Sequence, residues 1–196
     1  MDVITHYDML IDENNDSFRD SPLLQEYMNK WDGKVFWEAL KLDETKSVLE
    51  IGIGTGRIAV KVAPYCKRLT GIDFSPKTIE RAKENLKDFN NISFVCDDFN
   101  TYCFGEKFDV IYSSLTMMHF EDKQRVISKV DTLLKSGGIF CLSIDKNQNE
   151  YIDMGTRKVE IYPDTPDNII SLINPSSMNV VSVFETDKAY IIVSNK

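Results

Sequence analysis

The stretch from Val48 to Arg57 constrains the fold of this chain more than any other segment. Residues 48–51 have apolar and acidic side chains that indicate the end of a buried strand, and three glycines follow at alternate positions, Gly52, Gly54 and Gly56. Glycine lets a chain turn sharply and lets a ligand lie against bare peptide. Ligands of an open α/β sheet bind outside the carboxyl ends of its strands. The stretch therefore predicts a parallel sheet with a ligand site at this turn.

The composition agrees with a globular chain of one domain. The 196 residues are 42% hydrophobic and 28% charged, and no apolar run approaches the roughly 20 residues of a membrane-spanning helix. The first 20 residues hold six acids and one base, the opposite of a basic signal-peptide start, so we expect no membrane association and a cytoplasmic location. The formal net charge of −8 gives no sign of a basic face, which disfavours nucleic acid as a partner.

The four cysteines give no sign of a metal site. Cys66, Cys96, Cys103 and Cys141 lack the C-x-x-C spacing of zinc and iron–sulfur sites. We expect them to be small buried residues, and we expect no bound metal.

Strand-like and helix-like segments alternate between residues 47 and 145. The expected strands are Ser47–Ile53, Arg68–Asp73, Ile92–Cys96, Phe108–Ser113 and Ile139–Asp145. The expected helices between them are Arg57–Ala63, Pro76–Phe89 and Asp122–Leu134, and the Gly137-Gly138 pair is expected to end the last helical run at Lys135. This alternation predicts a parallel sheet with helices on both faces.

The last fifty residues have a different pattern. Residues 146–157 are polar and are expected to form a loop, and a short helix is expected at Asp167–Ile173. Asn179–Phe184 and Ala189–Val193 are expected to pair as an antiparallel hairpin across a turn of four polar residues.

An apolar stripe precedes the sheet. Ser21-Pro22 is a helix-start signal, with serine as the N-cap and proline at the first helical position. Leu24, Met28, Trp31 and Val35 then recur at helical spacing. We expect this stripe to pack against the sheet.

The glycine turn fits two cofactors. From Gly54 to Ala59 it follows the dinucleotide fingerprint G-x-G-x-x-G/A, and Asp73 lies 19 positions after Gly54, close to the spacing of a ribose-binding acid. A NAD-dependent oxidoreductase is therefore one alternative. From Glu50 the same turn has an acid two positions before the first of its three glycines, and Glu50 would be a poor neighbour for an anionic pyrophosphate.

Glu50–Gly56 resembles the first motif of the class I S-adenosylmethionine-dependent methyltransferases. The chain resembles further motifs of that family, in the same order, at Gly71–Ser75, Phe94–Phe99, Phe108–Ser114 and Leu133–Gly138. The resemblance is strong over residues 42–145 and loose over residues 165–196. The positive sulfonium of S-adenosylmethionine suits an acidic, glycine-lined site, which favours the methyltransferase over the oxidoreductase.

The resemblance implies an α/β fold, a three-layer α/β/α Rossmann-like arrangement with a mostly parallel seven-stranded sheet. The implied strand order is 3-2-1-4-5-7-6, ending in an antiparallel hairpin. The implied single domain covers residues 1–196. Residues 1–41 would form an N-terminal helical cap or lid, residues 42–145 the cofactor-binding core, and residues 146–196 the acceptor-side loop and terminal strands.

The resemblance also implies contacts to S-adenosylmethionine and its product S-adenosylhomocysteine. Asp73 is implied to bind the ribose hydroxyls, and Asp98, with Asp97 as the alternative, to accept a hydrogen bond from the adenine amino group. Two phenylalanines are implied to flank the adenine. The full implied set is Glu50, Gly52, Gly54, Gly56, Asp73, Phe74, Asp97, Asp98, Phe99, Ser113 and Ser114.

The acceptor is less constrained than the methyl donor. Residues 113–116 lack the Asn/Asp-Pro-Pro-aromatic motif of amino methyltransferases, no cysteine follows a proline, and no triple cysteine could hold a cluster. We therefore expect direct in-line transfer to a small-molecule O, N or S atom, with protein methylation left open. The family has no fixed catalytic residue, and His119 and Tyr7 are the candidates here. A non-catalytic, cofactor-binding partner subunit is a further alternative.

Overall fold

A single mixed sheet organises the chain. The computed structural model describes residues 1–196, and its seven-stranded sheet has the order β3-β2-β1-β4-β5-β9-β8. The strands are β1 (Ser47–Ile51), β2 (Arg68–Asp73), β3 (Ile92–Cys96), β4 (Phe108–Ser114), β5 (Leu134–Asp145), β8 (Asn179–Glu185) and β9 (Ala189–Asn195). All pairs up to β5 are parallel, and β9 runs antiparallel to both β5 and β8. The predicted fold class, strand order and terminal hairpin are confirmed.

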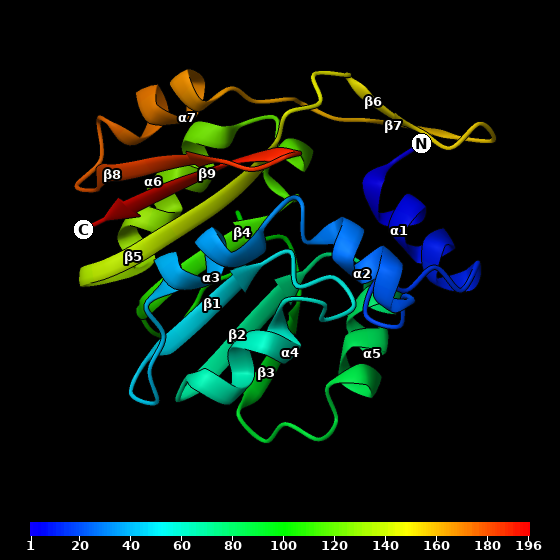
Figure 1. Cartoon of the computed structure of the whole chain (residues 1–196), viewed down its shortest axis with the longest axis horizontal. Coiled ribbons are helices and arrows are strands. Elements are labelled where there is room, and N and C mark those ends of the chain that lie inside the picture. Colours follow the sequence, from blue (N-terminus) through cyan, green and yellow to red (C-terminus); the bar gives the residue numbers. More distant parts are fainter.

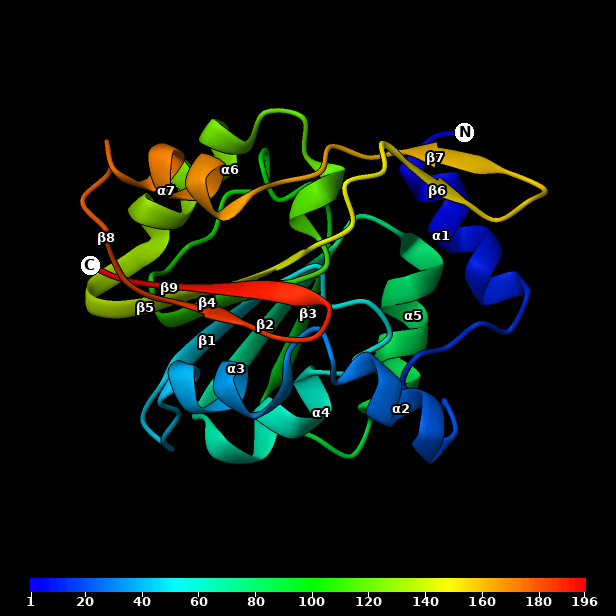
Figure 2. The same ribbon diagram turned by 45° about the horizontal axis from the view of Figure 1, so that its top comes forward.

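Helices cover both faces of this sheet, as Figures 1 and 2 show. One buried cluster joins the sheet to α3 (Gly33–Leu40), α4 (Ala59–Val62) and α5 (Pro76–Asn85). The cluster on the opposite face includes α6 (Lys123–Leu133) and α7 (Pro166–Ile173). Neighbouring residues of β1 point to opposite faces, so Val48 packs in the first cluster and Leu49 in the second.

The junction between α6 and β5 differs from the expectation. The helix ends at Leu133, and β5 begins at Leu134 and runs through the glycine pair, so the prediction that Gly137-Gly138 ends the helix was wrong. Leu134 is fully buried and pairs with Phe108, which draws it into the sheet. The Gly137 amide donates to the carbonyl of Lys196 at 2.7 Å, so the glycine pair contacts the end of β9.

Part of the predicted loop after β5 is ordered as a second, two-stranded sheet. β6 (Tyr151–Asp153) and β7 (Lys158–Glu160) pair antiparallel, so the expectation of a loop over residues 146–157 was wrong for this part. Val159 is fully buried although its neighbours are exposed. A single buried side chain in a polar run is too weak a pattern to indicate a strand.

The N-terminal stripe does not form one helix. The chain makes α1 (Val3–Asp12), then α2 (Pro22–Met28), and α3 begins only at Gly33. The break follows from Gly33, whose φ is +66°, and from buried Asp32, which accepts the Gly33 amide. Leu24 on α2 is half-exposed, so the expectation that it packs against the sheet was wrong. Figure 1 shows α1, α2 and the β6–β7 pair gathered at one end of the sheet.

Two of the four cysteines are exposed. Cys66 and Cys141 are buried as expected, whereas Cys96 and Cys103 are exposed because Cys96 ends an edge strand and Cys103 lies in a loop. No group of three or more histidine, cysteine or acidic side chains is placed to hold a metal ion. None of the helices combines the length and the apolar character needed to cross a bilayer.

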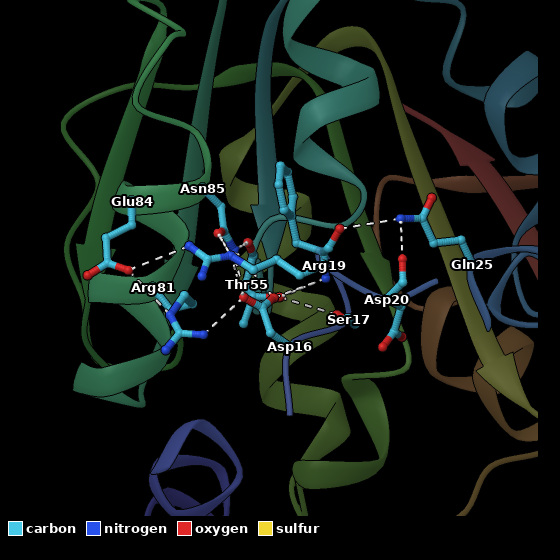
Figure 3. Close-up of polar contacts among 10 residues, drawn as sticks. Asp16, Ser17, Arg19, Asp20, Gln25, Thr55, Arg81, Glu84 and Asn85 are labelled. Carbon is cyan, nitrogen blue, oxygen red and sulfur yellow. Dashed lines mark hydrogen bonds and ion pairs between the residues drawn. The ribbon is translucent and has the colours of Figure 1, made fainter. Parts of the chain in front are cut away.

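A buried carboxylate fastens the N-terminal segment to the body of the fold. Asp16 accepts hydrogen bonds from Arg81 Nη1 at 3.1 Å and from Asn85 Nδ2 at 3.2 Å, both on α5 (Figure 3). Asn85 Nδ2 also donates to the Thr55 carbonyl of the glycine turn at 3.0 Å. The segment between α1 and α2 is therefore bound to α5 and to the turn together.

We predict that Asp16→Asn lowers the free energy of unfolding by about 3 kcal/mol at neutral pH, because it breaks a buried ion pair. Burial opposes ionisation of Asp16, but hydrogen bonds from Thr55, Asn85 and Arg81 outweigh it and lower the pKa below 3.8. A lowered folded pKa stabilises the protein above the unfolded pKa, and this contribution is lost as the pH falls through the folded value.

Urea unfolding at several pH values measures this effect. The difference between wild type and variant should shrink as the solution is acidified below the ordinary aspartate pKa. Asp20→Asn in the same segment, where no side-chain bond holds the carboxylate, is the control. A variant as stable as wild type at neutral pH would show that Asp16 does not fasten the segment.

Candidate functional site

A cavity of about 140 Å³ lies at the carboxyl ends of β1, β2 and β4. This is the edge of the sheet at which the glycine turn predicts a ligand. It is lined by Tyr7, Met28, Glu50, Gly52, Ile53, Gly54, Arg57, Ile58, Asp73, Phe74, Ser114, Leu115, Thr116 and His119. Met28 of the N-terminal stripe therefore lines this cavity.

The glycines of the turn have different roles. Gly54 has a φ of +55° and nothing within 4 Å of where a Cβ would lie, so its backbone is open to a ligand. Gly56 has a φ of +97°, and a Cβ there would come within 2.7 Å of Leu86. Gly56 does not line the cavity, so it serves the turn and its packing on Leu86. A Cβ on Gly52, which lines the cavity, would overlap Thr116.

Asp73 holds the turn and faces the same cavity. Its Oδ2 accepts the amide of Gly54 at 3.0 Å, and its Oδ1 accepts the amide of Ser75 at 3.1 Å. Burial raises the pKa of this carboxyl, and the two backbone hydrogen bonds oppose the rise. Each oxygen has further capacity to accept a hydrogen bond, so the carboxylate can bind a ligand while it holds the turn.

Glu50 is buried at the floor of the cavity, with 2% of its surface exposed. Tyr112 donates its hydroxyl to Glu50 Oε2 at 2.7 Å. Burial raises the pKa of Glu50 to about 8, although the Tyr112 hydrogen bond and the nearby Arg57 oppose the rise. At neutral pH the Glu50 carboxyl is therefore mostly protonated.

An ion pair that no sequence motif indicated lies beside this acid. Arg57 Nη2 donates to Asp32 Oδ2 at 2.6 Å, and Asp32 is completely buried. Arg57 precedes α4, which begins at Ala59, so its side chain is free to face the cavity. The two partners lie 25 residues apart in different segments, and their spacing carries no periodic signal.

The two catalytic candidates contact each other. The Tyr7 hydroxyl lies 2.8 Å from His119 Nε2, and the two rings are perpendicular at 5.3 Å. Burial lowers the pKa of His119 to about 4, so the imidazole is neutral at neutral pH. Burial also raises the pKa of Tyr7, which keeps the phenol protonated. Both side chains line the cavity, Tyr7 from α1 and His119 from the segment after β4.

The expected adenine contacts are placed unevenly. A narrow extension of the site is lined by Asp97, Phe74 and Phe99 but not by Asp98. Asp98 Oδ1 accepts the amide of Asn100 at 2.9 Å. Phe99 is 3% exposed and belongs to the core, whereas Phe74 is half-buried.

The two serines at the end of β4 also differ. Ser114 lines the cavity, and its Oγ is buried without a hydrogen-bond partner. Ser113 Oγ donates to the carbonyl of Ile51 at 3.0 Å and does not line the cavity. Side chains alternate along a strand, so only one of two neighbouring serines can face the cavity.

Comparison with known proteins identifies relatives of this fold and site. The family described as "Methyltransferase domain" matches residues 42–191. Malonyl-[acyl-carrier protein] O-methyltransferase 1 of Ilyobacter polytropus is 31% identical over 54% of this chain and 40% of its own length. Nodulation protein S of Sinorhizobium fredii is 33% identical over 52% of this chain and 49% of its own length. The matched region thus spans less than half the length of these curated relatives.

A solved structure has the same fold. The N-methyltransferase NodS from Bradyrhizobium japonicum WM9, in complex with S-adenosylhomocysteine, superposes with a TM-score of 0.67 at 22% identity. The match covers 90% of this chain and 89% of that one. At this identity the likeness establishes the fold.

We predict that wild type loses stability relative to Glu50→Gln as the pH rises from 4.5 to about 8. In that interval the folded state holds a proton on Glu50 that the unfolded chain has released, so the free energy of unfolding falls by up to about 1.4 kcal/mol per pH unit. Urea unfolding of both proteins across this interval measures the difference. Glu38→Gln, at an exposed position of α3, is the control, and equal pH dependence of wild type and Glu50→Gln would contradict the prediction.

Proposed function

The chain belongs to the class I S-adenosylmethionine-dependent methyltransferase family, and from that premise we propose that it transfers a methyl group to an O, N or S atom of a small molecule. The observation that carries the proposal is the cavity shared by the glycine turn, Asp73 and the Tyr7–His119 pair. It joins the expected cofactor contacts to side chains from the N-terminal cap.

The charges and hydrogen-bonding groups of the cavity support this cofactor. The two oxygens of Asp73 can each accept a hydrogen bond from a ribose hydroxyl. The open backbone at Gly54 leaves room for the amino-acid end, and Gly52 lines the same cavity. The half-buried ring of Phe74 offers an apolar contact to the adenine.

S-adenosylmethionine supplies an electrophilic methyl group and a good leaving group, so the protein's part is mainly to position the acceptor and to exclude water. Tyr7 and His119 line the same cavity as the glycine turn, which supports a role for them in contacting the acceptor. An imidazole with a pKa of about 4 is a weak base at neutral pH. The pair therefore fits binding and orientation of the acceptor better than removal of its proton.

The limited size of the cavity, about 140 Å³, supports a small acceptor. The side chains of Tyr7 and Met28 from the two N-terminal helices line the cavity, and Arg157 of the segment before β7 bonds to Glu13 and to His6 at the other side of α1. A relative acts on malonyl-[acyl-carrier protein] and a structural neighbour is an N-methyltransferase, so O and N acceptors are both represented among similar proteins.

Incubation with methyl-labelled S-adenosylmethionine and a panel of small O, N and S nucleophiles tests the proposal. We expect label in at least one acceptor. We also expect Asp73→Ala to lose transfer, because its free energy of cofactor binding should weaken by about 1.5–3 kcal/mol. Asp145→Ala, another strand-end acid that holds a loop amide, is the control. Cofactor binding without transfer to any acceptor, or transfer only with an added protein, would instead indicate a non-catalytic partner subunit.

A pair of neighbouring substitutions identifies the adenine-binding acid. The family register assigns this role to Asp98, although Asp97 is the acid that lines the narrow extension. We predict that Asp98→Ala weakens binding of S-adenosylhomocysteine more than Asp97→Ala does, as measured by isothermal titration calorimetry. The reverse order would assign the adenine amino group to Asp97.

A further inference from the structure

One arm of a buried arginine in the cofactor cavity has no partner. Arg57 is the only lysine or arginine that lines this cavity, and its side chain is 12% exposed. Its Nη2 bonds to Asp32, whereas Nη1 is buried with no hydrogen-bond partner. A buried guanidinium nitrogen without an acceptor is costly unless a ligand supplies one.

We propose that Arg57 Nη1 binds the carboxylate at the amino-acid end of S-adenosylmethionine and makes this chain selective for cofactors that carry it. The assignment rests on the proposed function. It adds a specificity residue that no motif in the sequence indicated, because Arg57 lies after the last glycine of the turn.

Asp32 fixes the direction of the free arm. Its Oδ2 accepts Arg57 Nη2 at 2.6 Å and its Oδ1 accepts the amide of Gly33 at 2.9 Å, so both oxygens of the completely buried carboxylate are engaged. The planar guanidinium presents its donors in a rigid fork. Once Nη2 is held by Asp32, the position of Nη1 is fixed without a ligand, which reduces the entropy lost on binding.

The charged groups around the cavity also favour a ligand that carries both a negative and a positive charge. The other ionisable groups lining it are the acids Glu50 and Asp73, the phenol of Tyr7 and the neutral imidazole of His119. A carboxylate placed among these groups meets one cation, Arg57. The ammonium of the same amino acid can donate a hydrogen bond to the Glu50 carboxyl, and its positive charge, like that of Arg57, lowers the pKa of Glu50 and favours its ionised form.

Calorimetric titration with two ligands that differ only in the carboxylate tests the assignment. The probes are S-adenosylhomocysteine and its decarboxylated form, 5′-deoxy-5′-(3-aminopropylthio)adenosine. Wild type should prefer S-adenosylhomocysteine by about 10- to 100-fold, the range for a hydrogen bond to a charged group. Arg57→Met should abolish that preference and leave the affinity for the decarboxylated ligand nearly unchanged.

Two further variants keep the test decisive. Lys61→Met removes the same charge one helical turn further on, at a side chain that does not line the cavity, and it should retain the wild-type preference. Arg57→Met leaves the buried carboxylate of Asp32 without its ion-pair partner. If this single variant fails to fold, the measurement is repeated on the double variant Arg57→Met/Asp32→Asn, in which neither side chain is charged.

The possible failures are distinguishable. If wild type binds S-adenosylhomocysteine and its decarboxylated form equally well, or if Arg57→Met keeps the preference, the assignment is wrong and the proposed function stands. A parallel loss of affinity for both ligands in the double variant would show that Arg57 only supports the turn. If wild type binds neither ligand, the proposed function fails and the assignment fails with it.

Discussion

The hydrogen bond between the Gly54 amide and the Asp73 carboxylate joins the two loops on which the site is built. Its length is 3.0 Å, and it is possible because β1 and β2 are adjacent parallel strands whose last paired residues are Ile51 and Ile72. The turn after one strand and the acid after the next therefore meet at the same edge of the sheet. Asp73 thus bonds to the backbone of the turn with which it lines the cavity.

Residues 1–41, the segment expected to form a cap, contribute side chains to this cavity. Acids on the cap bind bases elsewhere in the fold: Asp16 binds Arg81 of α5, and Glu13 binds Arg157 in the segment before β7. The cap also contributes the groups that face the cavity, the Tyr7 hydroxyl directly and Asp32 through its bond to Arg57. The acidic start of the chain thus has a structural role in positioning the side chains above the glycine turn.

The sequence was sufficient for the parts of the fold that repeat a local pattern. The seven strands were predictable because strand periodicity is local, whereas their order and the role of Asp73 beside the glycine turn followed from the resemblance to a known family. The ion pair of Arg57 with Asp32 and the contact of Tyr7 with His119 were not predictable, since their partners lie 25 and 112 residues apart. The β6–β7 pair was missed because two three-residue strands with few buried side chains carry almost no periodic signal.

A crystal structure of the full chain with S-adenosylhomocysteine tests the central claim most directly. The account predicts that the ribose hydroxyls bind Asp73 and that the amino-acid end lies over Gly52 and Gly54 beneath Tyr7. Binding of the nucleoside elsewhere on the sheet, or a ribose that makes no contact with Asp73, would contradict the account.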